Sequence, residues 1–437
     1  MRHSQAFGQD GRRVNPVVTG VGFITPIGND RASVEQNLRD GRHGIERVQF
    51  LGNADLPIKV AGTVKGFQVE SPKWRDWSWP SGYDIPKDVL RGLAPHGIYA
   101  ICAVEQALSH AGLGAPDLAG DPDTGLYCAS AGSAMLLHYN LAQMRAVQGA
   151  RGNPLGVVSS IAGTLNFNLA AHFQITGAVC GFVSACASAS HALGYAIDDL
   201  RLGRLNRAIV VGAEELNADS LLPFAHMRAL SNQADPRMAS RPFDVGRDGF
   251  VGAGGAVALV IEAPEAAARR GARPLAATMG WGQASDGYRV AASHPEGAGL
   301  RLAMERALAD AGVAPEEIDY VSAHATSTPV GDSAEALAIT QVFSARGLHP
   351  RIGATKGLTG HTLSLSGVMQ AGFCVLSITG GFMPGNPHLG VAAQECEGLE
   401  LPRGTTAAAP ARILSNSSGF GGSNVCHVFA APDRFTG

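Results

Sequence analysis

The sequence predicts an α/β protein in which sheets are covered by helices on both faces. Short runs of β-branched and small apolar residues alternate with segments of helical periodicity along the whole chain. The composition agrees, because 45% of residues are hydrophobic, 16% are charged and 56 are glycine, which is typical of compact small-residue packing. With 437 residues, the chain is long enough for two lobes around an ample core.

The first part of the chain contains two strands and two helices that the pattern predicts. Residues 17–24 (VVTGVGFI) alternate β-branched and small residues and stop at a Thr-Pro pair, which indicates a buried strand. Residues 97–112 show helical periodicity and end on a glycine. Residues 187–203 form an amphipathic helical pattern, and residues 207–211 (RAIVV) follow as a buried strand.

The second part of the chain continues the alternation. Residues 254–262 (GGAVALVIE) predict a strand and residues 299–312 a helix. Further strands are expected near Tyr320 and Ile413.

A weak join at residues 264–275, where charge, Pro and Gly rise, divides the chain into halves 1–265 and 266–437. No long low-complexity linker separates them, so we expect the halves to share one core, with the functional site between them.

Charge and cysteine usage exclude several classes of protein. A formal net charge of -3 gives no global electrostatic case for nucleic acid or an anionic membrane. We expect no signal sequence and no bilayer-spanning run, and therefore a cytoplasmic protein. The odd number of scattered cysteines, without a C-x-x-C pair, indicates free thiols rather than disulfides or a metal site: Cys102, Cys128, Cys180, Cys186, Cys374, Cys396 and Cys426.

One cysteine stands in a setting that favours reactivity. Cys186 lies in VSACASASH, after an apolar segment and before a helix rich in small residues. Unpaired backbone N–H groups and the helix dipole favour the thiolate there, and small neighbours admit a substrate. Taken alone, the segment is more typical of a buried structural cysteine, because free cysteines are commonly buried.

Two later segments carry histidines. In SAHATSTPVGD, His324 could donate to a developing negative charge, and Thr326 and Thr328 could bind an amide-bearing arm; a capped turn is the alternative. In ATKGLTGHTLSLSG, Lys356 and His361 flank a glycine turn, where a surface lysine and a capping histidine are the alternative.

The order of these residues is more specific than any one segment. One Cys is followed by two His, with no metal, flavin or nicotinamide signature, which indicates acyl transfer through a thioester. The glycine-rich run at residues 415–424 lacks the lysine and the spacing of a P-loop.

Nearly the whole chain resembles the elongating β-ketoacyl-acyl-carrier-protein synthases of the thiolase-like superfamily. The motifs in order are VVTGVGFITPIGN, GIYAICAVEQAL, VSACASASHALG, VVGAEE, ASRPFDVGRDGFV, AHATSTPVGD, TKGLTGH, NSSGFGGSN and SNVCHVF. The resemblance implies five layers, αβαβα, in two similar halves, and a dimer. It also implies an acyl carrier protein as partner, which brings its own phosphopantetheine, so that the chain itself needs no cofactor and no metal.

The same resemblance assigns roles by position. Cys186 matches the nucleophile that accepts the acyl group. His324 and His361 match the pair that promotes malonyl decarboxylation, and Lys356 matches the lysine that orients them, paired with Glu335.

Further positions match the family's binding and gating parts. Thr326 and Thr328 match the phosphopantetheine contacts, and the backbone N–H groups of Cys186 and Ser418 match the oxyanion hole. The expected gating loops are formed by Ser418, Gly419, Phe420, Gly421, Gly422 and Asp244.

An arginine surface is expected to bind the acidic carrier protein. Arg228 matches a family position near the carrier entrance, and Arg145 and Arg151 are candidates for the same surface. Ordinary solvated charges are the alternative for the last two.

Several residues depart from the family pattern. Ser418 replaces the usual Phe and removes a gate, Ala325 replaces Gly, and Gln370 replaces Glu. Ser364 and Ser366 replace Gly and Ala. This set favours a specialised enzyme of secondary metabolism that takes bulky or rigid chains, with a housekeeping fatty-acid enzyme as the alternative.

Two other functions are alternatives. A thiolase would use a second cysteine near the C-terminus, for which Cys426 is the nearest candidate. A non-catalytic partner subunit would lack the nucleophile, whereas Cys186 and both histidines are present. The sequence does not separate a homodimer from the catalytic half of a ketosynthase heterodimer.

Overall fold

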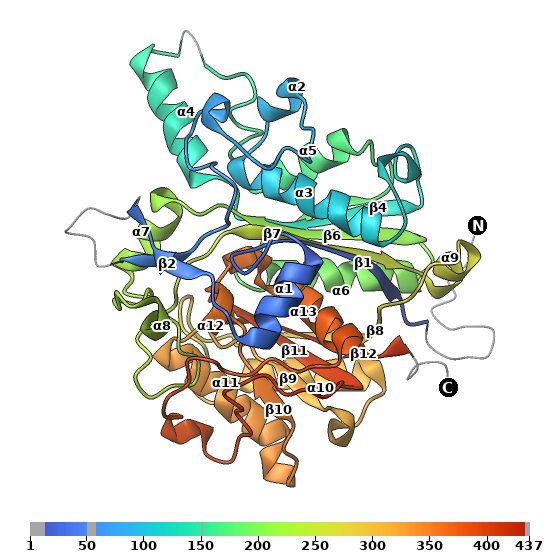
Figure 1. The fold of residues 1–437 in the computed structure, drawn as a ribbon, viewed down its shortest axis with the longest axis vertical. Coiled ribbons are helices and arrows are strands. Elements are labelled where there is room, and N and C mark those ends of the chain that lie inside the picture. The colour runs from blue at the N-terminus through green and yellow to red at the C-terminus, as the bar shows by residue number, and fades with distance from the viewer. Residues whose placement is uncertain (1–13, 50–57, 150–151, 433–437) are drawn as a thin grey trace.

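The computed structural model describes residues 14–49, 58–149 and 152–432 (Figure 1). Ten strands form one sheet in the order β10-β9-β11-β12-β8-β1-β7-β6-β4-β5. Their bounds are β1 Val17–Ile24, β4 Thr124–Ala129, β5 Val179–Phe182, β6 Arg207–Glu214, β7 Gly255–Glu262, β8 Ala276–Ser285, β9 Tyr320–Ser322, β10 Arg351–Gly353, β11 Arg412–Gly419 and β12 Ser423–Ala430. A separate pair is formed by β2 Ile45–Arg47 and β3 Val60–Gly62.

The helices lie between and outside these strands. Their bounds are α1 Arg31–Asp40, α2 Lys87–Leu90, α3 Pro95–His110, α4 Ala134–Ala146, α5 Thr164–His172, α6 Ser188–Arg201, α7 Ala218–His226, α8 Pro236–Ala239, α9 Pro264–Arg269, α10 Ala298–Ala311, α11 Pro329–Val342, α12 Lys356–Thr359 and α13 Ser366–Gly380.

The sheet consists of two halves with the same pairing pattern. From β1 through β7, β6 and β4 to β5, the pairs run antiparallel, antiparallel, parallel and parallel. From β8 through β12, β11 and β9 to β10, the pairs again run antiparallel, antiparallel, parallel and parallel. Among the described strands, the two halves of the sheet pair where β1 meets β8, at Val17↔Ala277 and Val18↔Ala276. The molecule is therefore built from two similar halves.

Helices complete five layers (Figure 1). Helices α3 and α5 cover the outer face of the first half, and α10, packed on α11, covers the outer face of the second. Helices α6 and α13 lie between the halves and contact strands of both. This is the thiolase-like arrangement that the resemblance implies, and the predicted division at residue 265 falls inside α9, between β7 and β8.

The middle layer is tight because its helices carry small residues. A Cβ added at Gly367 of α13 would lie 2.1 Å from the hydroxyl of Ser190 in α6. Glycine at this crossing lets the first turns of the two helices approach each other. Cys186 precedes one of these turns and His361 the other, so the crossing places them side by side.

Helix α13 is apolar on all sides. Of the described residues, one helical stretch, Leu363–Gly380, is long and apolar enough to cross a membrane by length and composition. It is mostly buried between the two half-sheets. A helix that is hydrophobic all round is also typical of a protein core.

Candidate active site

Cys186 lies in the turn between β5 and α6. The preceding residue, Ala185, has a left-handed backbone with φ 49°, which is uncommon for a residue with a side chain. The turn is held by Ser188, whose hydroxyl accepts from the Ser184 N–H and donates to the Ala185 carbonyl. The half-buried thiol lines a cavity of about 400 Å³.

Burial decides the resting state of this thiol. It raises the pKa of Cys186 to about 12, although the positive charge of Lys356 lowers it. Burial therefore opposes the thiolate that the start of α6 is expected to favour. The thiol needs a base, and the Nε2 atom of His361 lies 3.0 Å from its Sγ.

His361 is fixed by its own backbone. Its N–H donates to the Val251 carbonyl at 2.7 Å, and its carbonyl accepts from the Ala253 N–H at 3.0 Å. The Nδ1 atom lies 3.0 Å from the hydroxyl of Ser366, and the ring meets Phe250 edge to face. Every edge of this ring thus has a neighbour.

His324 completes the catalytic group. Its ring lies 5.3 Å from that of His361, centroid to centroid, and the planes are perpendicular. Burial, followed by the charge of Lys356, lowers the pKa of both rings well below the usual value. Both imidazoles are therefore neutral at neutral pH, and each can donate one N–H.

Lys356 does not pair directly with Glu335 as the sequence predicted. Its Nζ donates to Oε1 of Gln370 at 2.8 Å, and burial lowers its pKa to about 8. No ion pair joins Lys356 to Glu335 in the part of the chain that the structure describes. The Glu335 carboxylate instead accepts from the backbone N–H groups of His324 and Ala325 at 2.8 and 2.6 Å, and from the Asn416 amide. It supports the His324 loop and reaches Lys356 only through its charge.

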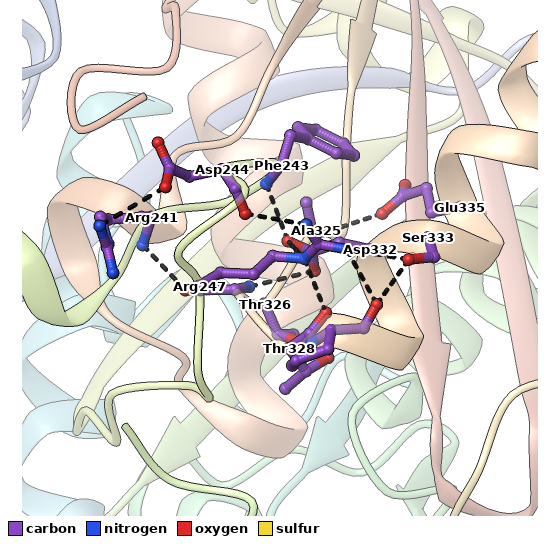
Figure 2. A network of polar contacts seen from close by, with 12 residues as sticks. Arg241, Phe243, Asp244, Arg247, Ala325, Thr326, Thr328, Asp332, Ser333 and Glu335 are labelled. Carbon is purple, nitrogen blue, oxygen red and sulfur yellow. Dashed lines mark hydrogen bonds and ion pairs between the residues drawn. The ribbon is translucent and has the colours of Figure 1, made fainter. Parts of the chain in front are cut away.

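A buried polar network holds the loop that follows His324 (Figure 2). The Asp332 carboxylate accepts from the backbone N–H groups of Phe243 and Ser327, and Arg247 Nε lies 3.7 Å from it. Arg247 also donates to the carbonyl of Thr328 at 3.3 Å. Sequence analysis did not single out Arg247 or Asp332, although both lie within recognised motifs.

The network keeps two threonines at the rim of the cavity. Thr326 and Thr328 both line it, and their hydroxyls lie 3.0 Å apart. Asp244, which was predicted in a gating loop, lines neither cavity at Cys186. Its buried carboxylate accepts from the N–H groups of Gly246, Gly390 and Val391.

The end of β11 and the turn that follows it pass directly beside the nucleophile. A Cβ at Gly419 would lie 2.7 Å from the Ser184 carbonyl oxygen and 3.0 Å from the Cys186 backbone nitrogen. Ser418, Gly419 and Phe420 line the cavity, whereas Gly421 and Gly422 do not. The Ser418 hydroxyl donates to Oδ1 of Asn424 at 2.8 Å, so this side chain is turned to its own strand pair.

A second cavity of about 240 Å³ lies on the other side of Cys186, and sequence analysis did not foresee it. Cys186, Leu363 and Phe420 line both cavities. The Phe420 ring lies 6.1 Å from that of Phe224, which lines the second cavity. The nucleophile thus stands where two cavities meet, beside an aromatic ring.

Of the three candidate arginines, two lie among the described residues, and only one of these two lines the cavity. Arg228 is exposed and lines the mouth of the larger cavity. Arg145 is exposed in the last turn of α4 and does not line it. Arg151 lies outside the described residues.

Cys426, the thiolase candidate, lies elsewhere. It is fully buried in β12, its thiol contacts Oδ1 of Asn416 at 3.2 Å, and it lines neither cavity at Cys186. It has no place in the chemistry at Cys186.

Comparison with known proteins decides the family. Residues 15–267 match the model of the beta-ketoacyl synthase N-terminal domain, and residues 275–390 match that of its C-terminal domain. The chain belongs to the beta-ketoacyl synthase family. It is therefore a condensing acyltransferase, and the resemblance found in the sequence is confirmed.

Individual relatives agree with this assignment. The chain is 34% identical to 3-oxoacyl-acyl-carrier-protein synthase 1 of Haemophilus influenzae over 420 residues, which are 94% of this chain and 98% of the relative. It is 34% identical to the Escherichia coli K12 protein of the same name over 418 residues, with the same shares covered.

Two solved structures share both fold and sequence. A beta-ketoacyl synthase from Burkholderia phymatum has a TM-score of 0.87 and 29% identity, covering 96% of this chain and 99% of that one. The ishigamide ketosynthase/chain length factor has a TM-score of 0.84 and 28% identity, with the same coverage.

Proposed function

We propose that this ketosynthase loads an acyl group from an acyl carrier protein onto Cys186 and condenses it with a malonyl group on a second carrier. The observation that carries the proposal is the 3.0 Å contact between Cys186 Sγ and His361 Nε2 at the meeting point of two cavities. One cavity suits the incoming carrier arm and the other the stored acyl chain.

In the first half-reaction, His361 takes the thiol proton and the thiolate attacks the carrier thioester. Negative charge then develops on the thioester oxygen. The backbone N–H groups of Cys186 and Ser418 are proposed as its donors, because the Ser418 loop lies beside Cys186. Fixed donors of this kind are each typically worth about 3 kcal/mol.

In the second half-reaction, the malonyl arm enters along Thr326 and Thr328. Neutral His324 donates its N–H to the malonyl thioester oxygen while carbon dioxide leaves, and neutral His361 does the same in the tautomer that carries its proton on Nε2. The resulting carbanion attacks the acyl carbonyl on Cys186 and forms the carbon–carbon bond. In this proposal the chain's own side chains suffice, and phosphopantetheine arrives on the carrier.

The edge strand β5 is proposed as the dimer contact. It is the last strand of the sheet, and Val183, directly after it, is 71% exposed. An uncovered edge with apolar side chains favours pairing with another chain. The partner is a second copy or a related ketosynthase-like chain.

We further propose a specialised pathway in the cytoplasm. Ser418 places a small side chain beside Cys186, which leaves room for a bulky or rigid acyl group. The similarity to the ishigamide ketosynthase/chain length factor supports a polyketide role. Housekeeping fatty-acid elongation is the second candidate, supported by the two 34% identical relatives.

Intact-mass measurement after incubation with a panel of acyl-carrier-protein thioesters tests this function. Adducts on the wild type that Cys186→Ala abolishes establish the nucleophile, and the preferred acyl group identifies the substrate class. If no donor gives an adduct, a candidate partner chain is added. Continued absence of adducts then contradicts the proposal, and a wide preference for simple saturated chains contradicts the specialised pathway.

A further inference from the structure

Ser366, the first residue of α13, holds the nitrogen of His361 that does not face the thiol. Its side chain is buried, with 1% of its surface exposed. Its Oγ lies 3.0 Å from Nδ1 of His361, while Nε2 of the same ring lies 3.0 Å from Cys186 Sγ. The ring thus stands between a thiol and a hydroxyl.

The hydroxyl has a second neighbour that can take its proton. Oγ1 of Thr362 lies 3.3 Å from Ser366 Oγ. A hydroxyl carries one proton and two lone pairs, and it can rotate. Ser366 can therefore donate to Thr362 and still accept from an N–H at Nδ1 of His361.

We propose that Ser366 is a positioning residue that accepts a hydrogen bond from Nδ1–H of His361 while Nε2 takes the proton of Cys186. This rests on the proposed acyl transfer. The hydroxyl stabilises the charged imidazolium, the form of the ring that most needs an acceptor at both nitrogens.

The proton and the bonds balance around this contact. The Cys186 proton moves to Nε2, and the thiolate forms a bond to the thioester carbonyl carbon. The bond from that carbon to the carrier sulfur then breaks, and the carrier thiolate takes the proton from Nε2. His361 returns to its neutral form, and Ser366 keeps its contact with Nδ1 throughout.

Other charges near the ring make a neutral acceptor important. The titratable groups that face His361 are the Cys186 thiol, the His324 ring and the ammonium of Lys356. The Glu214 carboxylate acts on Cys186 and the Glu335 carboxylate on Lys356. The Lys356 charge opposes a second positive charge on His361. Among the described contacts of Nδ1, the Ser366 hydroxyl is the one that can stabilise the protonated His361 ring against the repulsion from Lys356.

The test is the rate at which iodoacetamide alkylates Cys186 in Ser366→Ala, measured in a Cys180→Ser background because Cys180 is exposed, and followed by intact mass across the pH range where the protein stays folded. A hydrogen bond to a charged group is worth about one to two pKa units. We therefore expect alkylation at least about tenfold slower at neutral pH and a profile displaced upward by about one to two pH units. Acyl transfer slows by a similar factor, and the unfolding midpoint verifies that the variant is folded.

Ser377→Ala is the matched control. Ser377 lies in the same helix, is equally buried, and its hydroxyl has no hydrogen-bond partner in the described chain. We expect its profile to match the wild type, whereas a general loosening of α13 would displace both.

Two results overturn the proposal. Alkylation of Ser366→Ala at the wild-type rate means that the hydroxyl does not stabilise the charged ring. Faster alkylation means that it donates to Nδ1 and keeps the ring neutral. Because iodoacetamide replaces the acyl substrate, these results stay readable even if the wild type accepts no acyl group, which is how the proposed function itself would fail.

Discussion

Replacing Lys356 with methionine should leave the protein as stable as the wild type, or more stable, while it damages the active site. Burial lowers the pKa of this lysine from 10.5 to about 8, a difference of about 2.5 units, which makes its buried charge cost roughly 3 kcal/mol at neutral pH. Methionine has a similar length and no charge, but it leaves Oε1 of Gln370 without its donor. An unsatisfied buried acceptor costs about 1–3 kcal/mol, so the net gain is about 0–2 kcal/mol.

The stability difference between Lys356→Met and the wild type should change with pH in a definite direction. The folded-state pKa of Lys356 lies below its unfolded value, so the unfolded chain holds the extra proton between about pH 8 and 10.5. Wild-type stability from this group therefore rises with pH across that window, and the advantage of Lys356→Met shrinks over the same range. The advantage is constant below the window.

Urea unfolding midpoints of the two proteins, measured at several pH values, provide the assay. Lys87→Met, at an exposed position in α2, is the control for the substitution itself and should leave the midpoint unchanged. A loss of more than about 1 kcal/mol in Lys356→Met at neutral pH would refute the reasoning, because the charged lysine would then be a net stabiliser. Malonyl decarboxylation should fall in the same variant, because it loses both the hydrogen bond to Gln370 and the positive charge that adds to burial in lowering the pKa of the two histidines.

Three further changes test other parts of the structure. Gly367→Ala should lower the unfolding free energy by about 2 kcal/mol or more, measured by urea titration, because its methyl group would overlap Ser190; an unchanged midpoint contradicts the close helix crossing. Arg228→Glu should slow acyl transfer from carrier protein about tenfold at low salt but not transfer from a small thioester, so equal losses with both donors would argue against a carrier contact at the cavity mouth. Ser418→Phe should add a second ring near Phe420 and reduce transfer of bulky acyl groups several-fold relative to short ones in the intact-mass assay; an unchanged preference excludes position 418 as a selector.

Elements with a clear local period were predicted well. The strand predicted at residues 17–24 is β1, the helix at 187–203 is α6, and the helix at 299–312 is α10. Strand β8 was not predicted, because its glycines fit against the backbone of α10 and lower its strand character. Helix α13 was not predicted either, because it is apolar on every side and shows no period.

The nucleophile and its histidines were predictable because each lies in a short motif, and the structure brings the three together. The contacts that hold these three residues in place were less predictable from the sequence. That Gln370, rather than Glu335, touches Lys356 depends on how α12 and α13 pack in space. Ser366 departs from the family pattern, and this difference is visible in the sequence. Only the fold shows that its hydroxyl reaches the ring of His361.

The shared middle layer also determines when the enzyme becomes reactive. Cys186 belongs to the first half of the chain, and its base, His361, follows 175 residues later. During synthesis the thiol therefore leaves the ribosome long before its proton acceptor, and Phe420, which lines both cavities at Cys186, follows later still. An unfinished chain therefore carries the thiol without its base and without a complete cavity, so it cannot yet capture acyl groups that it could not pass on.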